Sequence, residues 1–331
     1  MSIQETNLKA IADAIRAKLG TTDTIKASQF AAKIGEISTG VAKPSWVQST
    51  LPAKTNWTAV CYGGGKYVAT TRWAASTLHS TDGVNWTRSS GPNLVEGFGL
   101  ATCYGGGKFV SVELNADKAY YSTDGTNWTT TTLPGTRQWY SVCYGGGKFV
   151  AVNSDTMLPA YSTDGITWSS GRLPVNAMWQ SVCYGNGKFV AITYGSSIAA
   201  YSTDGITWTQ TTLPTSANWY SVCYGGGKFV AITYGSSIAA YSTDGITWTQ
   251  TTLPASKSWS SVCYGGGKFV AIAERSSVAA YSTDGITWTQ TTLPASENWS
   301  SVCYGGGKFV VMVNDPVDIA AYLKDSFDEW A

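Results

Sequence analysis

The chain has 331 residues, 43% of them hydrophobic, so it is long enough to bury a large core. Its formal net charge is only +1 and its charged residues are not clustered, which argues against binding nucleic acid or an anionic membrane through charge. The 36 Gly, 15 Trp and 19 Tyr, beside only 13% charged residues, indicate many tight turns between short strands.

Two short amphipathic helices are predicted first. One spans residues 5–19, where four apolar side chains fall on one stripe: Leu8, Ile11, Ile15 and Leu19. The other spans residues 28–37 and carries Phe30, Ile34 and Ile37. Helices this short cannot bury their apolar faces alone. Residues 1–37 are therefore expected to be a docking or oligomerisation segment, followed by a linker over residues 38–45.

The N-terminal residues contain no apolar run of signal-peptide type. No later stretch approaches the length of a membrane span. We therefore expect a protein without a signal peptide that folds in a cytoplasm and has no membrane partner and no nucleic-acid partner.

From residue 46 onward the chain is a tandem repeat. CYGGGK or a close variant begins at seven cysteines, spaced by 42 residues once and then by 40: Cys61, Cys103, Cys143, Cys183, Cys223, Cys263 and Cys303. STDG followed by two residues and Trp places six aspartates, with a degenerate seventh copy at Asp325: Asp82, Asp124, Asp164, Asp204, Asp244 and Asp284. Seven copies of a unit of about 40 residues are typical of a closed repeat fold.

Each unit is predicted to contain four antiparallel strands. In the unit that begins at Trp219, a Gly-rich turn joins the first two strands and Asp244-Gly245 joins the last two. This is the size of one propeller blade. The predicted fold is mainly β: a seven-bladed β-propeller over residues 46–331, with a short N-terminal α-helical segment.

The two ends of the repeat region complement each other. The last unit stops at Trp330-Ala331 without most of its fourth strand, and the missing piece stands before the first unit, over residues 46–52. We expect this N-terminal strand to complete the last blade and close the ring, which leaves no long open edge.

The sequence STDGITW resembles a compact Asp-box, the turn between the third and fourth strands of sialidase-like propellers, although Asp and Gly are adjacent here. The resemblance covers residues 46–331. It implies the fold but no single function, since binding modules and a few enzymes share it.

The run NLKAIADAIRAK, followed by IKASQFAAKI, resembles the N-terminal segment of bacteriophage tail and appendage proteins over residues 1–40. This resemblance implies a virion protein whose N-terminal helices dock on other virion proteins, assembled in the host cytoplasm and released by lysis. A homo-oligomer is also expected, with a trimer as the first hypothesis.

The repeated residues are interpreted as structural. Each aspartate is expected to accept N–H groups of its own turn, and one per blade is too dispersed for a shared metal ion. The cysteines are expected to be buried free thiols, because no CxxC pair is present. Packing is favoured over sugar stacking for the tryptophans that start the first strands: Trp57, Trp139, Trp179, Trp219, Trp259 and Trp299. His79 is assigned to blade packing. No catalytic residue, metal or cofactor is predicted.

The variable loops are the candidate binding surface. The Gly-rich and Asp-box turns project from one face and hardly vary, whereas the loops between the second and third strands and between blades project from the other face and differ. Four residues there combine loop position with stacking area or a planar donor group: Trp73, Tyr194, Tyr234 and Arg275. Tyr194 and Tyr234 have the alternative of packing within their own turns.

Three functions are compatible with this pattern. The first hypothesis is a non-enzymatic phage virion protein that binds the host surface, a glycan before a protein, through the variable face. The second is a virion decoration or capping protein without host binding. The third is a sialidase-like glycoside hydrolase, for which the five scattered propeller arginines offer no cluster: Arg72, Arg88, Arg137, Arg172 and Arg275.

Overall fold

The computed structural model describes residues 12–14, 17, 45–71, 76–90 and 101–324. Residues 12–14 and 17 are helical. The rest of the two predicted N-terminal helices, the linker up to residue 44 and the degenerate copy at Asp325 lie outside the described residues. Trp46–Lys324 forms one compact unit and is described by itself.

This unit is built from strands. Their bounds are β1 (Ser45–Thr55), β2 (Trp57–Gly63), β3 (Lys66–Thr71), β4 (Ser76–Ser80), β5 (Thr87–Ser90), β6 (Ala101–Gly105), β7 (Lys108–Val112), β8 (Leu114–Ser122), β9 (Thr129–Gly145), β10 (Lys148–Asn153), β11 (Ala160–Ser162), β12 (Ser169–Ser170), β13 (Trp179–Gly185), β14 (Lys188–Thr193), β15 (Ser196–Ser202), β16 (Thr209–Ala217), β17 (Trp219–Gly225), β18 (Lys228–Ser242), β19 (Thr249–Gly265), β20 (Lys268–Ser282), β21 (Thr289–Gly305), β22 (Lys308–Val313) and β23 (Val317–Lys324).

In the described chain these strands pair into four-stranded units, mostly antiparallel by their pairing registers, which are called blades here and numbered in chain order. Blade 1 is β2–β5 and blade 4 is β13–β16. Three long strands, β9, β19 and β21, each leave one blade as its fourth strand and enter the next as its first. Blade 2 therefore joins β6–β8 to the start of β9, and blade 3 joins the end of β9 to β10–β12. Blades 5 and 6 are built from β17–β21 in the same way, and blade 7 contains the end of β21, β22, β23 and β1.

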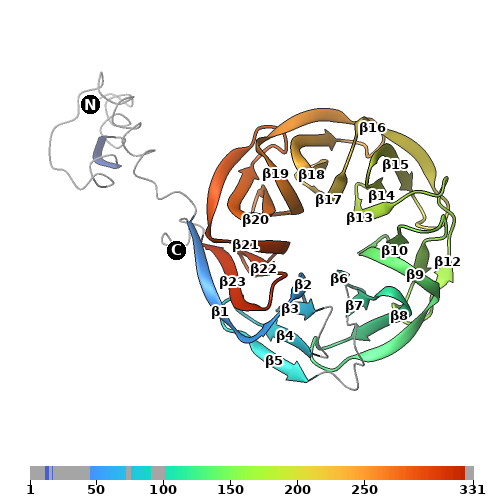
Figure 1. Ribbon diagram of the computed structural model, residues 1–331, viewed down its shortest axis with the longest axis horizontal. Helices are drawn as coiled ribbons and strands as arrows, with labels where there is room; N and C mark the ends of the chain where they lie inside the picture. The colour runs from blue at the N-terminus through green and yellow to red at the C-terminus, as the bar shows by residue number, and fades with distance from the viewer. Residues whose placement is uncertain (1–11, 15–16, 18–44, 72–75, 91–100, 325–331) are drawn as a thin grey trace, which may run out of the picture. The chain divides into compact units, whose positions relative to one another are not determined.

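The blades stand side by side around a ring. Figure 1 shows β2, β6, β13 and β17 toward its centre and β5, β12 and β16 on its rim. The architecture is that of a β-propeller, as the repeat predicts.

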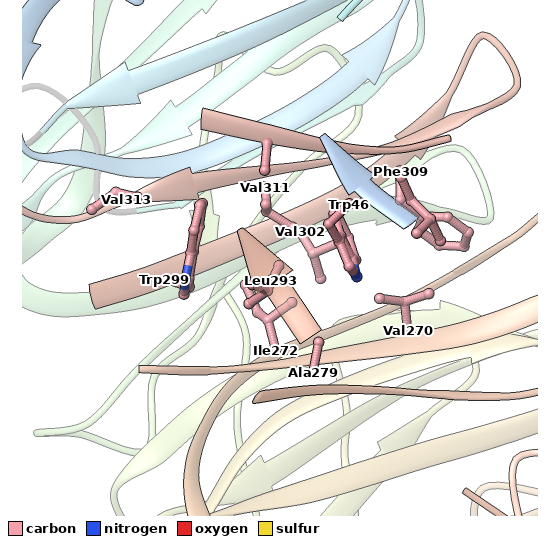
Figure 2. Packing of buried hydrophobic residues seen from close by; sticks show 12 residues of the cluster. Trp46, Val270, Ile272, Ala279, Leu293, Trp299, Val302, Phe309, Val311 and Val313 are labelled. Carbon is pink, nitrogen blue, oxygen red and sulfur yellow. The ribbon is translucent and has the colours of Figure 1, made fainter. Parts of the chain in front are cut away.

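The first strand of this unit lies in its last blade. Strand β1 pairs with β23 at the edge of blade 7. Its Trp46 belongs to the buried cluster that also contains Leu293, Trp299 and Val302 (Figure 2). Hydrogen bonds then join blade 7 to blade 1: Ser300 Oγ donates to the Trp57 carbonyl at 2.8 Å, and the Val60 N–H donates to Ser301 Oγ at 3.1 Å. The ring is therefore continuous between its last and first blades.

The hydrophobic core lies between neighbouring blades. The six tryptophans that begin first strands are all 0% exposed, which confirms packing as their role: Trp57, Trp139, Trp179, Trp219, Trp259 and Trp299. Five of the six donate their indole N–H to a backbone carbonyl; Trp219, for example, donates to Thr215 at 3.1 Å. Such a bond is favourable because an unmet donor is costly in the core. Trp57 is the exception, since its buried indole N–H has no hydrogen-bond partner among the described residues.

Close contact between blades explains the first glycine of each Gly-rich turn. A Cβ atom added at Gly225 would lie 2.0 Å from Cγ of Tyr264 in the next blade. The following two positions turn the chain with positive φ: Gly226 at 54° and Gly227 at 77°. Blade 4 has Asn186 at the first of these, with φ of 45°, a conformation that Asn tolerates better than most residues.

Candidate functional site

The face that carries the Gly-rich and Asp-box turns is called here the turn face. In blade 4, Asp204 Oδ1 accepts the N–H groups of Ile206 and Thr207 at 2.8 and 2.9 Å. The same pair of contacts, to the residues two and three positions on, occurs at the other five Asp-box aspartates: Asp82, Asp124, Asp164, Asp244 and Asp284. These N–H donors lower the pKa of Asp164 and Asp284 to about 2. The carboxylates are therefore engaged by their own turns, as predicted.

The opposite face contains a cavity of about 310 Å³ and is called here the cavity face. Every blade contributes to the cavity wall. One set of lining residues shares a position in the repeat: each directly follows the tryptophan of the first strand. These are Thr58, Tyr140, Gln180, Tyr220, Ser260 and Ser300. The serines next in sequence in blades 3 to 5 also line the cavity: Ser141, Ser181 and Ser221. The remaining three residues follow the second strand of the repeat: Leu114, Glu274 and Asn314.

A repeated β-bulge turns the first set toward the cavity. In blade 5 the pairing register of β17 on β18 shifts between Trp219 and Ser221, so Tyr220 has no direct partner. The same shift occurs at the equivalent residue of blades 1, 3, 4, 6 and 7. A bulge re-aims one side chain without breaking the strand. Trp219 can therefore remain buried between blades while the next side chain lines the cavity.

The residues that follow the second strands are fixed through their backbone. The Tyr194 N–H donates to the Met178 carbonyl, the Tyr234 N–H to Asn218 and the Asn314 N–H to Asn298, each at 2.8 Å. In blades 4, 5 and 7 these bonds join the segment after the second strand to the segment that enters the same blade. Because the bonds use backbone atoms only, they do not depend on which side chains stand at these positions.

Tyr220 is the centre of an aromatic cluster at this rim. Its ring centroid lies 5.3 Å from that of Tyr234 and 6.4 Å from that of Tyr194, the latter edge-on at 72°. Burial raises the pKa of Tyr220, and the nearby Glu274 carboxylate and the tyrosines Tyr234, Tyr140 and Tyr194 raise it further. The Tyr220 hydroxyl is therefore neutral and able to donate or accept a hydrogen bond at any ordinary pH.

Glu274 is the charged residue of the described cavity wall. Burial raises its pKa, although the Tyr234 hydroxyl donates to the carboxylate and Arg275 supplies positive charge nearby, both of which favour the charged form. The described lining contains no Lys, Arg or His. Chemically, the cavity offers hydrogen-bond acceptors, hydroxyl donors and tyrosine rings.

Of the four predicted binding residues, the structure describes three, and none of these three lines the cavity. Trp73 lies outside the described residues. Tyr194 and Tyr234 are half-buried against Tyr220 and support the cavity wall without lining it. Arg275 is exposed beside Glu274, has φ of 50°, and does not line the cavity either.

The predicted set omitted the residues that line the cavity most directly. Tyr140, Gln180 and Tyr220 follow a buried tryptophan and were assigned to first strands. A signal was nevertheless present: this position varies from blade to blade, whereas the Ser/Ala-Val-Cys-Tyr or closely similar segment after it is nearly constant. Variation inside a constant strand marks a side chain that the core does not use.

The other reactive residues offer no second site among the described positions. All seven cysteines are free thiols, and burial raises their pKa. Full burial was predicted but holds only for Cys61 and Cys183; five are half-buried, because first strands are the inner edge strands of their blades. His79 on β4 contacts Ser89 at 2.9 Å.

Within the described chain, no three His, Cys, Asp or Glu side chains are grouped to hold a metal ion. No helix there is long and apolar enough to cross a membrane.

The fold and its central cavity define the class as a β-propeller. No family model matches the chain, and no curated protein matches its sequence. Among solved structures it is similar to virginiamycin B lyase from Staphylococcus aureus, with a TM-score of 0.76 at 12% identity over 85% of this chain and 99% of that chain. For a catalytically inactive histidine-to-alanine variant of that lyase, with quinupristin, the TM-score is 0.75 at 14% identity over 85% of this chain and 99% of that chain. For YCF48 bound to D1 peptide, the TM-score is 0.68 at 14% identity over 85% of this chain and 96% of that chain. At these identities the likeness establishes the fold alone.

Proposed function

We propose that this chain is a binding module of a bacteriophage virion that recognises a glycan on the host surface through its cavity face. The observation that carries the proposal is the cavity at the centre of a repeated scaffold, lined by side chains that differ between blades. Residues that vary on a rigid frame are typical of recognition surfaces. The proposal includes a complete seven-bladed ring, closed by β1.

The chemistry of the lining favours a saccharide. Tyrosine rings stack on apolar faces, and Gln, Ser, Thr and Asn supply neutral hydrogen-bonding groups, a combination suited to sugars. A host protein is the second ligand class, because the similar YCF48 propeller has been seen with a bound peptide.

The proposed role is not enzymatic. Glycoside hydrolysis in most families uses two carboxyl groups on either side of the scissile bond. The described cavity wall contains one, Glu274. The similar lyase is inactive after a histidine-to-alanine change, whereas His79, the single histidine here, lies on β4 and does not line the cavity. These observations favour binding over turnover.

Attachment to the particle is assigned to residues 1–37, with the propeller facing outward. This part of the proposal rests on the resemblance of residues 1–40 to phage tail and appendage proteins. A homo-oligomer, first a trimer, is proposed for the same segment, and light scattering of the full-length protein tests it. A decoration protein without host binding would share this attachment but not the binding activity.

The test uses the full-length protein on an array of bacterial surface glycans. Tyr140→Ala changes the cavity wall, and Asp204→Ala changes the turn face as a control. We expect wild type and Asp204→Ala to bind the same glycans and Tyr140→Ala to bind them more weakly. A folded wild type that binds no glycan would overturn glycan recognition, while release of a sugar product would favour a hydrolase.

A further inference from the structure

The cavity has two chemically different sides. On blades 3 to 5 the bulge positions carry the large side chains Tyr140, Gln180 and Tyr220. On blades 6 and 7 the equivalent positions are Ser260 and Ser300. The large side chains therefore lie toward blades 3 to 5, and the small ones lie toward blades 6 and 7.

The aromatic side is preorganised. Tyr220 is held between Tyr194 and Tyr234, at centroid separations of 6.4 and 5.3 Å. A ring fixed by its neighbours loses little side-chain freedom when a ligand stacks on it. Beyond Tyr194 the surface continues to Met178, which is 48% exposed and whose carbonyl accepts the Tyr194 N–H.

The side formed by blades 6 and 7 presents acceptors. Glu274 and Asn314 occupy equivalent positions of these blades, directly after the second strand of the repeat. The Asn314 side-chain oxygen has no hydrogen-bond partner among the described residues, but it is buried within the wall and is not open to the cavity. The Glu274 carboxylate receives the Tyr234 hydroxyl and, with two oxygens, retains further capacity to accept. Glu274 is therefore suited to a ligand that brings hydroxyl donors.

We propose that the cavity binds the end of an uncharged saccharide, with the sugar ring against Tyr140 or Tyr220 and its hydroxyl groups donating to Glu274. Vicinal hydroxyls match a carboxylate because each oxygen can accept one donor. The cavity volume of about 310 Å³ is near the lower limit of ligand pockets, so it admits about one or two sugar rings and not an internal chain segment.

The same charge pattern disfavours acidic sugars. A ligand carboxylate or phosphate would lie near the Glu274 carboxylate in a partly dehydrated cavity, where like charges repel more strongly than in water. Arg275, outside the described wall, offsets part of this repulsion, but the wall itself has no cationic side chain among the described residues. The inference rests on the proposed glycan-binding function and adds to it the charge class of the ligand and the residue that selects it.

The experiment compares neutral glycans with their acidic counterparts, such as a hexose and the matching uronic acid at the same terminal position. Full-length wild type and Glu274→Gln are titrated with both members of each pair. Glu297→Gln is the matched control, because Glu297 lies in the part of β21 that passes from blade 6 to blade 7, where it pairs with Ser276, and does not line the cavity. The amide keeps the size of the carboxyl group and removes its charge.

We expect wild type to bind the neutral member more tightly. Glu274→Gln is expected to lose about tenfold in affinity for the neutral glycan, since one charge-assisted hydrogen bond is weakened, and to discriminate less against the acidic one. Glu297→Gln should change neither quantity. The ratio of neutral to acidic affinity is the decisive readout, because a purely structural role of Glu274 would not change it.

The outcomes separate the two proposals. If folded wild type binds no glycan, both fail. If it binds glycans but prefers the acidic members, or if Glu274→Gln leaves the ratio unchanged, the neutral-sugar inference fails and glycan recognition stands.

Discussion

The turn face and the cavity face are made by the same repeat, yet they tolerate change differently. On the turn face, the Gly225 position must be small because Tyr264 of the next blade occupies its space, and Asp204 is engaged by its own turn. On the cavity face, the bulge removes Tyr220 from the strand pairing and from the core. Residues used by a neighbouring blade are constant, and residues released by the bulge are variable.

One repeat thus places the contacts between blades on one face and the variable side chains of the cavity on the other. Every blade repeats the contacts that hold its neighbour, so a change on the turn face weakens the ring. Among the cavity side chains, Ser260 and Ser300 donate to backbone carbonyls of the next blade, whereas the larger side chains of Tyr140, Gln180 and Tyr220 line the cavity at the same position. We expect these three larger side chains to be replaceable at small cost to stability.

Removing β1 should affect both faces, because it opens blade 7. Trp46 and Leu51 of this strand are 7% and 3% exposed, and loss of two large buried side chains costs about 3–5 kcal/mol each. A chain that begins after Pro52 should therefore melt far below one that begins after Gly40. Thermal melts of the two truncations measure this, and equal melting temperatures would show that β1 does not fasten the ring.

Gly225→Ala should be the most damaging point change on the turn face. The added Cβ would collide with the Tyr264 ring, and overpacking of this kind costs roughly 3 kcal/mol or more. Gly227→Ala is the matched control, because nothing lies within 4 Å of its added Cβ and only the positive φ of 77° is strained, at about 1–2 kcal/mol. Denaturant unfolding gives both values, and a larger loss for Gly227→Ala would contradict the close-contact argument.

The Asp-box turns should make the protein sensitive to acid. Backbone N–H donors lower the pKa of Asp164 and Asp284 to about 2, whereas the pKa of Asp in an unfolded chain is about 3.9. The unfolded chain therefore takes up protons first, so the stability these carboxylates contribute is complete above about pH 4 and is lost as the pH falls toward about 2. Melts across this range should show a shallower loss in Asp164→Asn/Asp284→Asn than in wild type. Parallel curves would show that these turns do not drive the acid response.

The smallest effects compare one residue from each face. Asp204 is exposed, so Asp204→Ala should cost only about 1 kcal/mol, and glycan binding should persist. Arg275→Ala should change the free energy of unfolding by no more than about 0.5 kcal/mol. It should weaken binding only modestly, because Arg275 acts on Glu274 from outside the cavity wall. Binding and melting are measured on the same samples. Loss of binding in Asp204→Ala with normal binding in Arg275→Ala would show that the two faces have been interchanged.

Several features were accessible from the sequence because they depend on local rules. Regular spacing of CYGGGK and STDG predicts repeated four-stranded units, and the glycine pairs predict their turns. The role of the Asp-box aspartates also follows locally, since Asp commonly accepts hydrogen bonds from residues two and three positions on. Burial of the repeated tryptophans follows from their size and apolar character.

Tertiary structure alone decided which variable residues line the cavity. The binding role predicted for Tyr194, Tyr234 and Arg275 from their loop positions stays a prediction. None of these three lines the cavity, whereas Tyr140, Gln180 and Tyr220 from strands do. A bulge is a property of paired strands, so no single segment reveals it. The close approach of Tyr264 to Gly225, the meeting of Tyr220 with Glu274, and the cavity itself arise only when separate blades are brought around one ring. The local sequence pattern therefore determines the strands and turns of one blade. The assembly of blades determines which side chains line the cavity.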